Sequence, residues 1–133
     1  MAYEIPYSNA SGKAAANSEL HGWVEELVKT CQPYHGLFLT IPEAVGEHEG
    51  RSGDLRNSLS EAVRQILLRI PIQEILIDGG STASEIVRRM DWPCLLCTQE
   101  FARGVVRMQI RKKPDLHLTV KPGCYSWPEY FWK

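Results

Sequence analysis

The sequence has no long hydrophobic run and little excess of either charge. No stretch of its 133 residues approaches the roughly 20 consecutive apolar residues that a membrane-spanning helix needs. Residues 1–10 contain Glu4, Pro6 and Asn9 where a secretion signal would be apolar, so we expect a cytoplasmic protein with no membrane partner. An apolar content of 44% argues against a disordered chain, and the length suits one domain.

The sequence also lacks a long basic run. Its formal net charge is −1, and its longest basic run is Arg111-Lys112-Lys113. Domains that bind nucleic acid usually carry a larger basic patch, so the composition argues against a nucleic-acid partner. The charge is nevertheless uneven, because residues 88–121 hold eight Lys or Arg and three Asp or Glu. This excess favours an anionic ligand such as a phosphate, although solvated surface charges give the same pattern.

Cysteines are few, at positions 31, 94, 97 and 124. The pair Cys94-x-x-Cys97 raises the possibility of a zinc or redox site. The surrounding apolar residues predict a short strand, however, and residues three apart in a strand point to opposite faces. No histidine lies nearby as a third ligand, and the four histidines show no metal-ligand spacing among themselves. We therefore predict buried, reduced thiols at Cys94 and Cys97, and no metal site.

Hydrophobic patterning predicts helices alternating with strands after a loose N-terminal segment, residues 1–16. Apolar residues recur at helical spacing in residues 17–30 and 54–70, and Asp54 is a candidate cap for the second helix. A third, short helix is predicted at 84–90. Short apolar runs bounded by turn residues predict five strands, at 36–41, 72–78, 94–98, 105–110 and 116–120.

This order of elements predicts a single α/β domain over residues 17–133. The helix at 54–70 joins the strands at 36–41 and 72–78, and such a connection forces parallel pairing. The last strands are too close in sequence for helical connections, so they should pair antiparallel. We therefore expect a three-layer α/β/α domain whose sheet is mixed but mostly parallel.

A glycine turn follows the strand predicted at 72–78. Its residues are Gly79-Gly80-Ser81-Thr82-Ala83. A turn that enters a helix exposes backbone N–H groups and the positive end of the helix dipole, which suits an anion. The two glycines would let a phosphate approach the backbone, and the two hydroxyls could donate to it. Alternatively, Thr82-x-x-Glu85 fits a capping box that satisfies these amides internally. The turn matches no standard nucleotide-binding fingerprint.

A second glycine turn, Lys121-Pro122-Gly123, follows the last predicted strand. Here Lys121 could place its charge on a phosphate, and Gly123 could offer an unobstructed N–H. An ordinary surface turn would have the same sequence. The tail that follows is rich in aromatic residues, which could stack on a nucleotide base, close over the core or dock on a partner. They are Tyr125, Trp127, Tyr130, Phe131 and Trp132.

These motifs together resemble a known family. The segment Ile77-Asp78-Gly79-Gly80-Ser81-Thr82-Ala83, followed about forty residues later by Thr119-Val120-Lys121-Pro122-Gly123, is similar to the C-terminal nucleotide-binding domain of the four-carbon acid sugar kinases. The intervening segment Glu100–Val106 also resembles that family's acidic-then-Gly-Val segment. The resemblance runs from about Gly36 to Pro128, and its specificity comes from the order and spacing of the motifs.

In that family, a separate N-terminal domain binds the acid sugar and the C-terminal domain binds ATP. The resemblance implies that Gly79, Gly80, Ser81, Thr82 and Ala83 hold the phosphates of ATP or ADP, with Mg²⁺ as a candidate companion, and that Lys121 and Gly123 line the same site. Because no sugar-binding domain is recognised here, we expect a nucleotide-binding part that is not a complete kinase alone. A sugar-binding domain or a second copy would be its partner. The alternative is a non-catalytic protein that associates through its aromatic tail.

Overall fold

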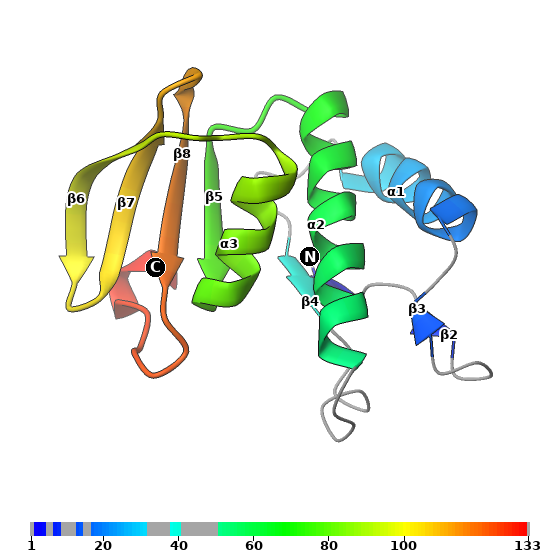
Figure 1. Ribbon diagram of the computed structural model, residues 1–133, viewed down its shortest axis with the longest axis horizontal. Helices are drawn as coiled ribbons and strands as arrows, with labels where there is room; N and C mark the ends of the chain where they lie inside the picture. The colour runs from blue at the N-terminus through cyan, green and yellow to red at the C-terminus, as the bar shows by residue number, and fades with distance from the viewer. Residues whose placement is uncertain are drawn as a thin grey trace. The chain divides into compact units, whose positions relative to one another are not determined.

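The computed structural model describes residues 2–4, 7–8, 13–14, 17–31, 38–40 and 51–132, and it divides the chain into two compact units (Figure 1). The first unit is Met1–Ile70 and the second is Pro71–Lys133. All the predicted site residues belong to the second unit. None of the described helices is both long enough and apolar enough to cross a bilayer.

In the first unit, the described residues include two helices that pack on each other, α1 (Asn17–Cys31) and α2 (Arg51–Arg69). Both present an apolar stripe, and the side chains buried on them include Leu20, Val24, Leu27, Leu55, Ala62 and Ile66. Because α2 begins at Arg51, the prediction that Asp54 caps this helix is wrong. A polar contact also joins the two helices, with His21 Nδ1 lying 3.3 Å from Gln65 Oε1.

The described residues of the first unit also include four short strands. β1 (Ala2–Glu4) pairs in parallel with β4 (Phe38–Thr40), and β2 (Tyr7–Ser8) pairs antiparallel with β3 (Lys13–Ala14). The strand predicted at 36–41 is therefore present at its centre, while its ends lie outside the described residues. Three of these strands fall in the segment expected to be a loose lead-in.

The second unit is built on a four-stranded sheet. Its strands are β5 (Glu74–Asp78), β6 (Leu95–Ala102), β7 (Val105–Ile110) and β8 (Lys113–Lys121), in the spatial order β5-β8-β7-β6. Only β5 and β8 pair in parallel, whereas β7 pairs antiparallel with both β6 and β8. The predicted α/β class and mixed sheet are confirmed.

The expectation of a mostly parallel sheet is wrong, because short turns join β6 to β7 and β7 to β8 and such turns allow only antiparallel pairing. Among the described strands, β4 pairs with β1 and β5 pairs with β8.

The two faces of this sheet carry different elements. Residues of α3 (Gly80–Arg89) line a hollow together with Leu118 and Val120 of β8, so these side chains point to the α3 face. Because side chains alternate along a strand, Thr119 and Lys121 point to the opposite face, which also holds Trp127 of the C-terminal segment. Figure 1 shows α3 covering the part of the sheet nearest β5. The 3-10 helix η2 (Glu129–Trp132) ends the described chain.

Candidate functional site

The two predicted glycine turns leave the sheet at the same edge. β5 and β8 run parallel, and Asp78 at the end of β5 is paired in register with Lys121 at the end of β8. Directly beyond this pair, the backbone N–H of Gly79 donates to the carbonyl of Lys121 at 2.8 Å. The carboxyl ends of parallel strands are where open α/β sheets commonly bind ligands. The fold thus brings Gly79 and Lys121, which are far apart in sequence, into direct contact.

The first of these turns is the start of a helix. α3 begins at Gly80, so the prediction of a turn at 79–83 followed by a helix at 84–90 is wrong. Gly79 is the N-cap with φ 107°, a backbone conformation that favours glycine. The N–H of Ala83 donates to the carbonyl of Gly79 at 3.1 Å and closes the first helical turn. The amides of Gly80, Ser81 and Thr82 precede that bond and have no acceptor within the helix.

The capping box that would satisfy these amides internally is not formed. The cap residue is a glycine, no side chain caps the helix, and Thr82 lies inside the first turn. Glu85 instead pairs with two arginines of the same helix, accepting from Arg88 at 2.5 Å and from Arg89 at 3.4 Å. The hydrogen bond from Arg88 is the main cause that lowers the pKa of Glu85. The N-terminus of α3 is therefore uncapped by side chains.

The structure places Lys121 on the other face of the sheet from α3. Its side chain is 6% exposed, and its Nζ lies 2.7 Å from Oδ1 of Asp78. The same ammonium donates to the carbonyls of Tyr125 at 2.8 Å and Pro122 at 3.2 Å. Trp127 adds a ring whose centroid is 6.0 Å from Nζ. Lys121 thus binds the turn that contains Gly123 to the end of β5.

The turn itself is closed and leaves Gly123 exposed. The N–H of Tyr125 donates to the carbonyl of Pro122 at 3.0 Å, and no atom lies within 4 Å of the position that a Cβ on Gly123 would take. The ring of Tyr125 packs against Gly104 in the connection between β6 and β7, so close that a Cβ there would lie 2.7 Å from Tyr125 Cδ2. Sequence reasoning missed this contact, for which the only signal was the glycine between two predicted strands.

Most of the basic residues counted in segment 88–121 are paired with carboxylates. Besides the arginines of α3 and Lys121, Arg107 bonds Glu74 at 2.7 Å and Lys112 bonds Asp91 at 2.8 Å. These pairs neutralise much of the local excess, so any anion at this edge would be held by backbone amides more than by side-chain charge. In the part of the chain that the structure describes, no three His, Cys, Asp or Glu residues gather as metal ligands.

The four cysteines form no disulfide, and the burial of Cys94 and Cys97 differs from the prediction. Cys94 is half-buried and precedes β6, while Cys97 is exposed within β6. The prediction of burial is wrong for Cys97 because β6 is the outer strand of its sheet, where residues 96–100 are all exposed.

Comparisons with known proteins show a shared fold. No family profile matches the sequence, and no curated protein matches it. Among solved structures, the chain is similar to a Salmonella typhimurium LT2 protein provisionally described as a tRNA synthase, with a TM-score of 0.76 and 12% identity over 98% of this chain. It is also similar to a Haemophilus influenzae protein of family DUF1537, with a TM-score of 0.67 and 16% identity over 98% of this chain.

A third similar structure is a DUF1537 domain from Bordetella bronchiseptica, described as a domain-swapped dimer with bound citrate. It gives a TM-score of 0.72 and 17% identity over 94% of this chain. The matches cover 33%, 33% and 31% of the three solved chains, so this chain spans about a third of their length. The chain therefore has the fold of one part of the DUF1537 proteins.

Proposed function

We propose that this chain binds ADP or ATP at the N-terminus of α3, with Gly123 at the edge of the same site, as the nucleotide-binding part of a four-carbon acid sugar kinase. The observation that carries the proposal is the uncapped start of α3 at the edge where β5 and β8 end. The resemblance of the two glycine motifs to that family and the fold shared with DUF1537 proteins support it.

The chemistry at this site is electrostatic stabilisation of phosphate oxygens. The amides of Gly80, Ser81 and Thr82 would donate to them, and the helix dipole favours negative charge there. Gly80 has open space where a Cβ would be, so a phosphate can approach the backbone. Preorganised donors of this kind stabilise the charge that develops in phosphoryl transfer. Mg²⁺ would be held largely by the phosphates themselves, with water in its remaining positions.

Transfer of the phosphoryl group needs a second part that binds the acid sugar. The similar solved chains are about three times as long as this one, which leaves room for such a part. The citrate bound to the Bordetella protein is a polycarboxylate and fits an acidic substrate for the whole enzyme. We therefore expect no sugar phosphorylation by this chain alone.

Calorimetric titration with ADP tests the proposal. Gly80→Val fills the space above the amides and should weaken ADP binding about tenfold or more, a change of about 1.4 kcal/mol. Gly22→Val is the matched control, because Gly22 is also helical and also has open space at its Cβ, but it lies on α1. Absence of saturable ADP binding by the unmodified chain, or equal binding by Gly80→Val, would overturn the proposal.

The exposed aromatic residues favour association as the second candidate function. Tyr130 is 57% exposed and Trp132 is 53% exposed, and both belong to η2. Exposed aromatic side chains of this size are typical of interaction surfaces. Sedimentation over a range of concentrations tests this candidate. If the unmodified chain forms a dimer but does not bind ADP, and Tyr130→Ser abolishes that dimer, association is favoured over nucleotide binding.

A further inference from the structure

A groove runs along one side of α3. It consists of two adjoining hollows of about 270 Å³ and 340 Å³, which share Ser84 and Val87. The first hollow begins at Gly80 and the second reaches Asp91. Gly80, Ser84 and Val87 lie three or four positions apart on α3, so they form one stripe on the helix, and Asp91 follows its C-terminal end. The groove therefore starts at the proposed phosphate site and follows α3 over the sheet.

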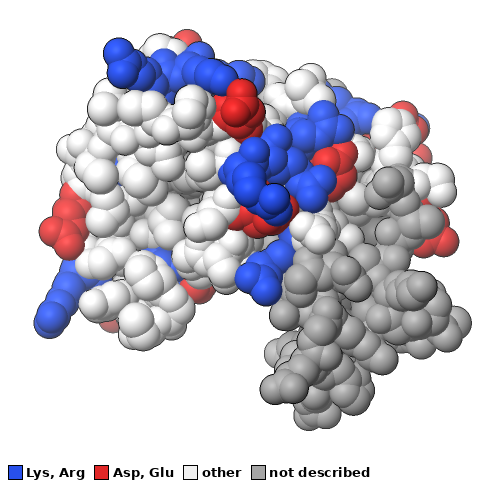
Figure 2. All heavy atoms as spheres, viewed as in Figure 1, with Lys and Arg blue, Asp and Glu red and all other residues white. Residues whose placement is uncertain are grey.

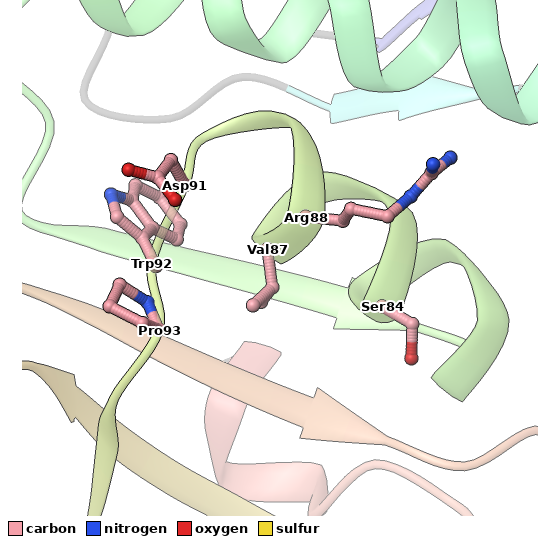
Figure 3. Close-up of a pocket in the computed structure, with 6 residues that line it drawn as sticks. All are labelled: Ser84, Val87, Arg88, Asp91, Trp92 and Pro93. Atoms are coloured by element: carbon pink, nitrogen blue, oxygen red, sulfur yellow. The ribbon is translucent and has the colours of Figure 1, made fainter.

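The two residues that border both hollows, Ser84 and Val87, point into the groove from the helix. Figure 3 shows Ser84 and Val87 projecting from α3 toward the strands, whereas Arg88 extends away from them. Figure 2 shows mainly uncharged atoms on the same face, over β6 to β8. The charged groups of α3 thus lie outside the part of the groove nearest Gly80.

The lining of the first hollow is uncharged throughout. It includes Ala83, Val87, Leu95, Met108, Leu118 and Val120. A charged or strongly hydrated group would lose its solvation in such a place. A planar aromatic ring suits it better, because the thioether of Met108 makes favourable contacts with aromatic rings. The Ser84 hydroxyl is the polar side chain available to a ring nitrogen or an exocyclic amine.

We propose that this groove holds the purine base of the nucleotide whose phosphates bind at the start of α3. This assignment rests on the proposed function. Ser84 lies one helical turn, about 6 Å along the axis, from Gly80. A ligand that uses both ends must therefore carry an anionic group and a flat apolar group joined by a short linker. A nucleoside diphosphate has this arrangement, whereas inorganic pyrophosphate has only the anionic part.

The test compares ADP with inorganic pyrophosphate on the full chain. Ser84→Phe adds bulk to the groove from an exposed position, so the fold should tolerate it. Met108→Trp fills the groove from the sheet side as a second, independent variant. Gln109→Trp is the matched control, because Gln109 is the next residue of β7 and its side chain points to the opposite face.

We expect both groove variants to raise the dissociation constant of ADP about tenfold or more while that of pyrophosphate stays within twofold. Gln109→Trp should leave both unchanged. Unchanged ADP binding in both groove variants, or an equal loss of ADP and pyrophosphate, would overturn the base assignment. If neither ligand binds the unmodified chain, the proposed function itself has failed. Pyrophosphate binding without any preference for ADP would overturn the base assignment alone.

Discussion

The ammonium of Lys121 lies 2.7 Å from the carboxylate of Asp78, and it is the buried partner of this pair. The side chain of Lys121 is 6% exposed, whereas that of Asp78 is 60% exposed. The ammonium also donates to the carbonyls of Pro122 and Tyr125, so with the Asp78 carboxylate it contacts three oxygens of the chain. We infer that Lys121 positions the Pro122–Gly123 turn at the end of β5 and does not donate to the ligand from this conformation.

Replacement of Lys121 by methionine should therefore destabilise the chain. Lys121→Met removes the ammonium that bonds the Tyr125 carbonyl, whereas the Pro122 carbonyl keeps the N–H of Tyr125. It also removes the tie between the turn and the end of β5. Hydrogen bonds to a charged donor contribute about 1.5–3 kcal/mol each, and we expect a loss of about 2 kcal/mol here. Urea unfolding measures the loss. Hydrogen exchange at the Gly79 amide should also become faster, since its acceptor is the carbonyl of Lys121.

Lys112 is the matched control for this prediction. It also bonds one aspartate, with contacts to both the carbonyl and the carboxylate of Asp91, but its side chain is 53% exposed. Exposed ion pairs contribute little, so Lys112→Met should cost about 0.5 kcal/mol or less. An equal cost for the two lysine variants would contradict a special role for Lys121.

The contact between Gly104 and Tyr125 predicts a second sensitive position. Gly104 has φ 77°, and an added Cβ would lie 2.7 Å from the ring of Tyr125. Gly104→Ala should destabilise the chain by about 2 kcal/mol, because it combines a strained backbone with a steric clash. Gly123→Ala meets no atom within 4 Å and should change stability little. Thermal unfolding of both variants checks the difference, and a stable Gly104→Ala would show that the ring moves freely.

Elements with strong periodicity were predictable from the sequence. The strand at 105–110 was predicted with its observed bounds, and the helix predicted at 17–30 differs by one residue. The start of α3 was not predictable in the same way, because Gly79-Gly80-Ser81-Thr82 has the local preferences of a turn. Tertiary packing decides the outcome there, since Ala83 and Ile86 are buried when the helix begins at Gly80.

The site was predictable only in part. A strand that ends in a glycine turn identifies one edge of a sheet, and the structure places Asp78 and Lys121 side by side at that edge. The partners of Lys121 could not be predicted, because two of them are backbone carbonyls that carry no sequence pattern. The face of the sheet that each side chain of β8 occupies depends on the register of its antiparallel pairing with β7.

A buried hydroxyl gives a third prediction. Thr119 is 0% exposed, and its Oγ1 donates to Glu74 Oε1 at 3.1 Å on the face opposite α3. Arg107 binds the same carboxylate through two nitrogens, at 2.9 Å and 2.7 Å. Glu74→Ala leaves the hydroxyl without its acceptor and should cost about 1–2 kcal/mol.

Adding Thr119→Val to this variant removes the stranded hydroxyl. The double variant should therefore regain part of the lost free energy of unfolding, although Thr119→Val alone destabilises the unmodified chain. A double-mutant cycle measured by urea unfolding gives the coupling directly. Additive costs would show that the hydroxyl and the carboxylate are energetically independent.

The ion pairs of Glu85 predict a pH dependence of stability. The hydrogen bond from Arg88 lowers the pKa of Glu85 below its ordinary value of 4.5. The stabilising contribution is therefore fully present above pH 4.5 and is lost as the pH falls through the lower value of the folded state. Glu85→Gln should be less stable than the unmodified chain at pH 7, and the difference should shrink at acidic pH. Unfolding curves of both proteins at a series of pH values measure this difference.

In a chain that carries Arg88→Gln and Arg89→Gln, the pH-dependent part of the Glu85→Gln effect should disappear, because the partners that lower the pKa are gone. Persistence of that part without the arginines would assign the effect to another group.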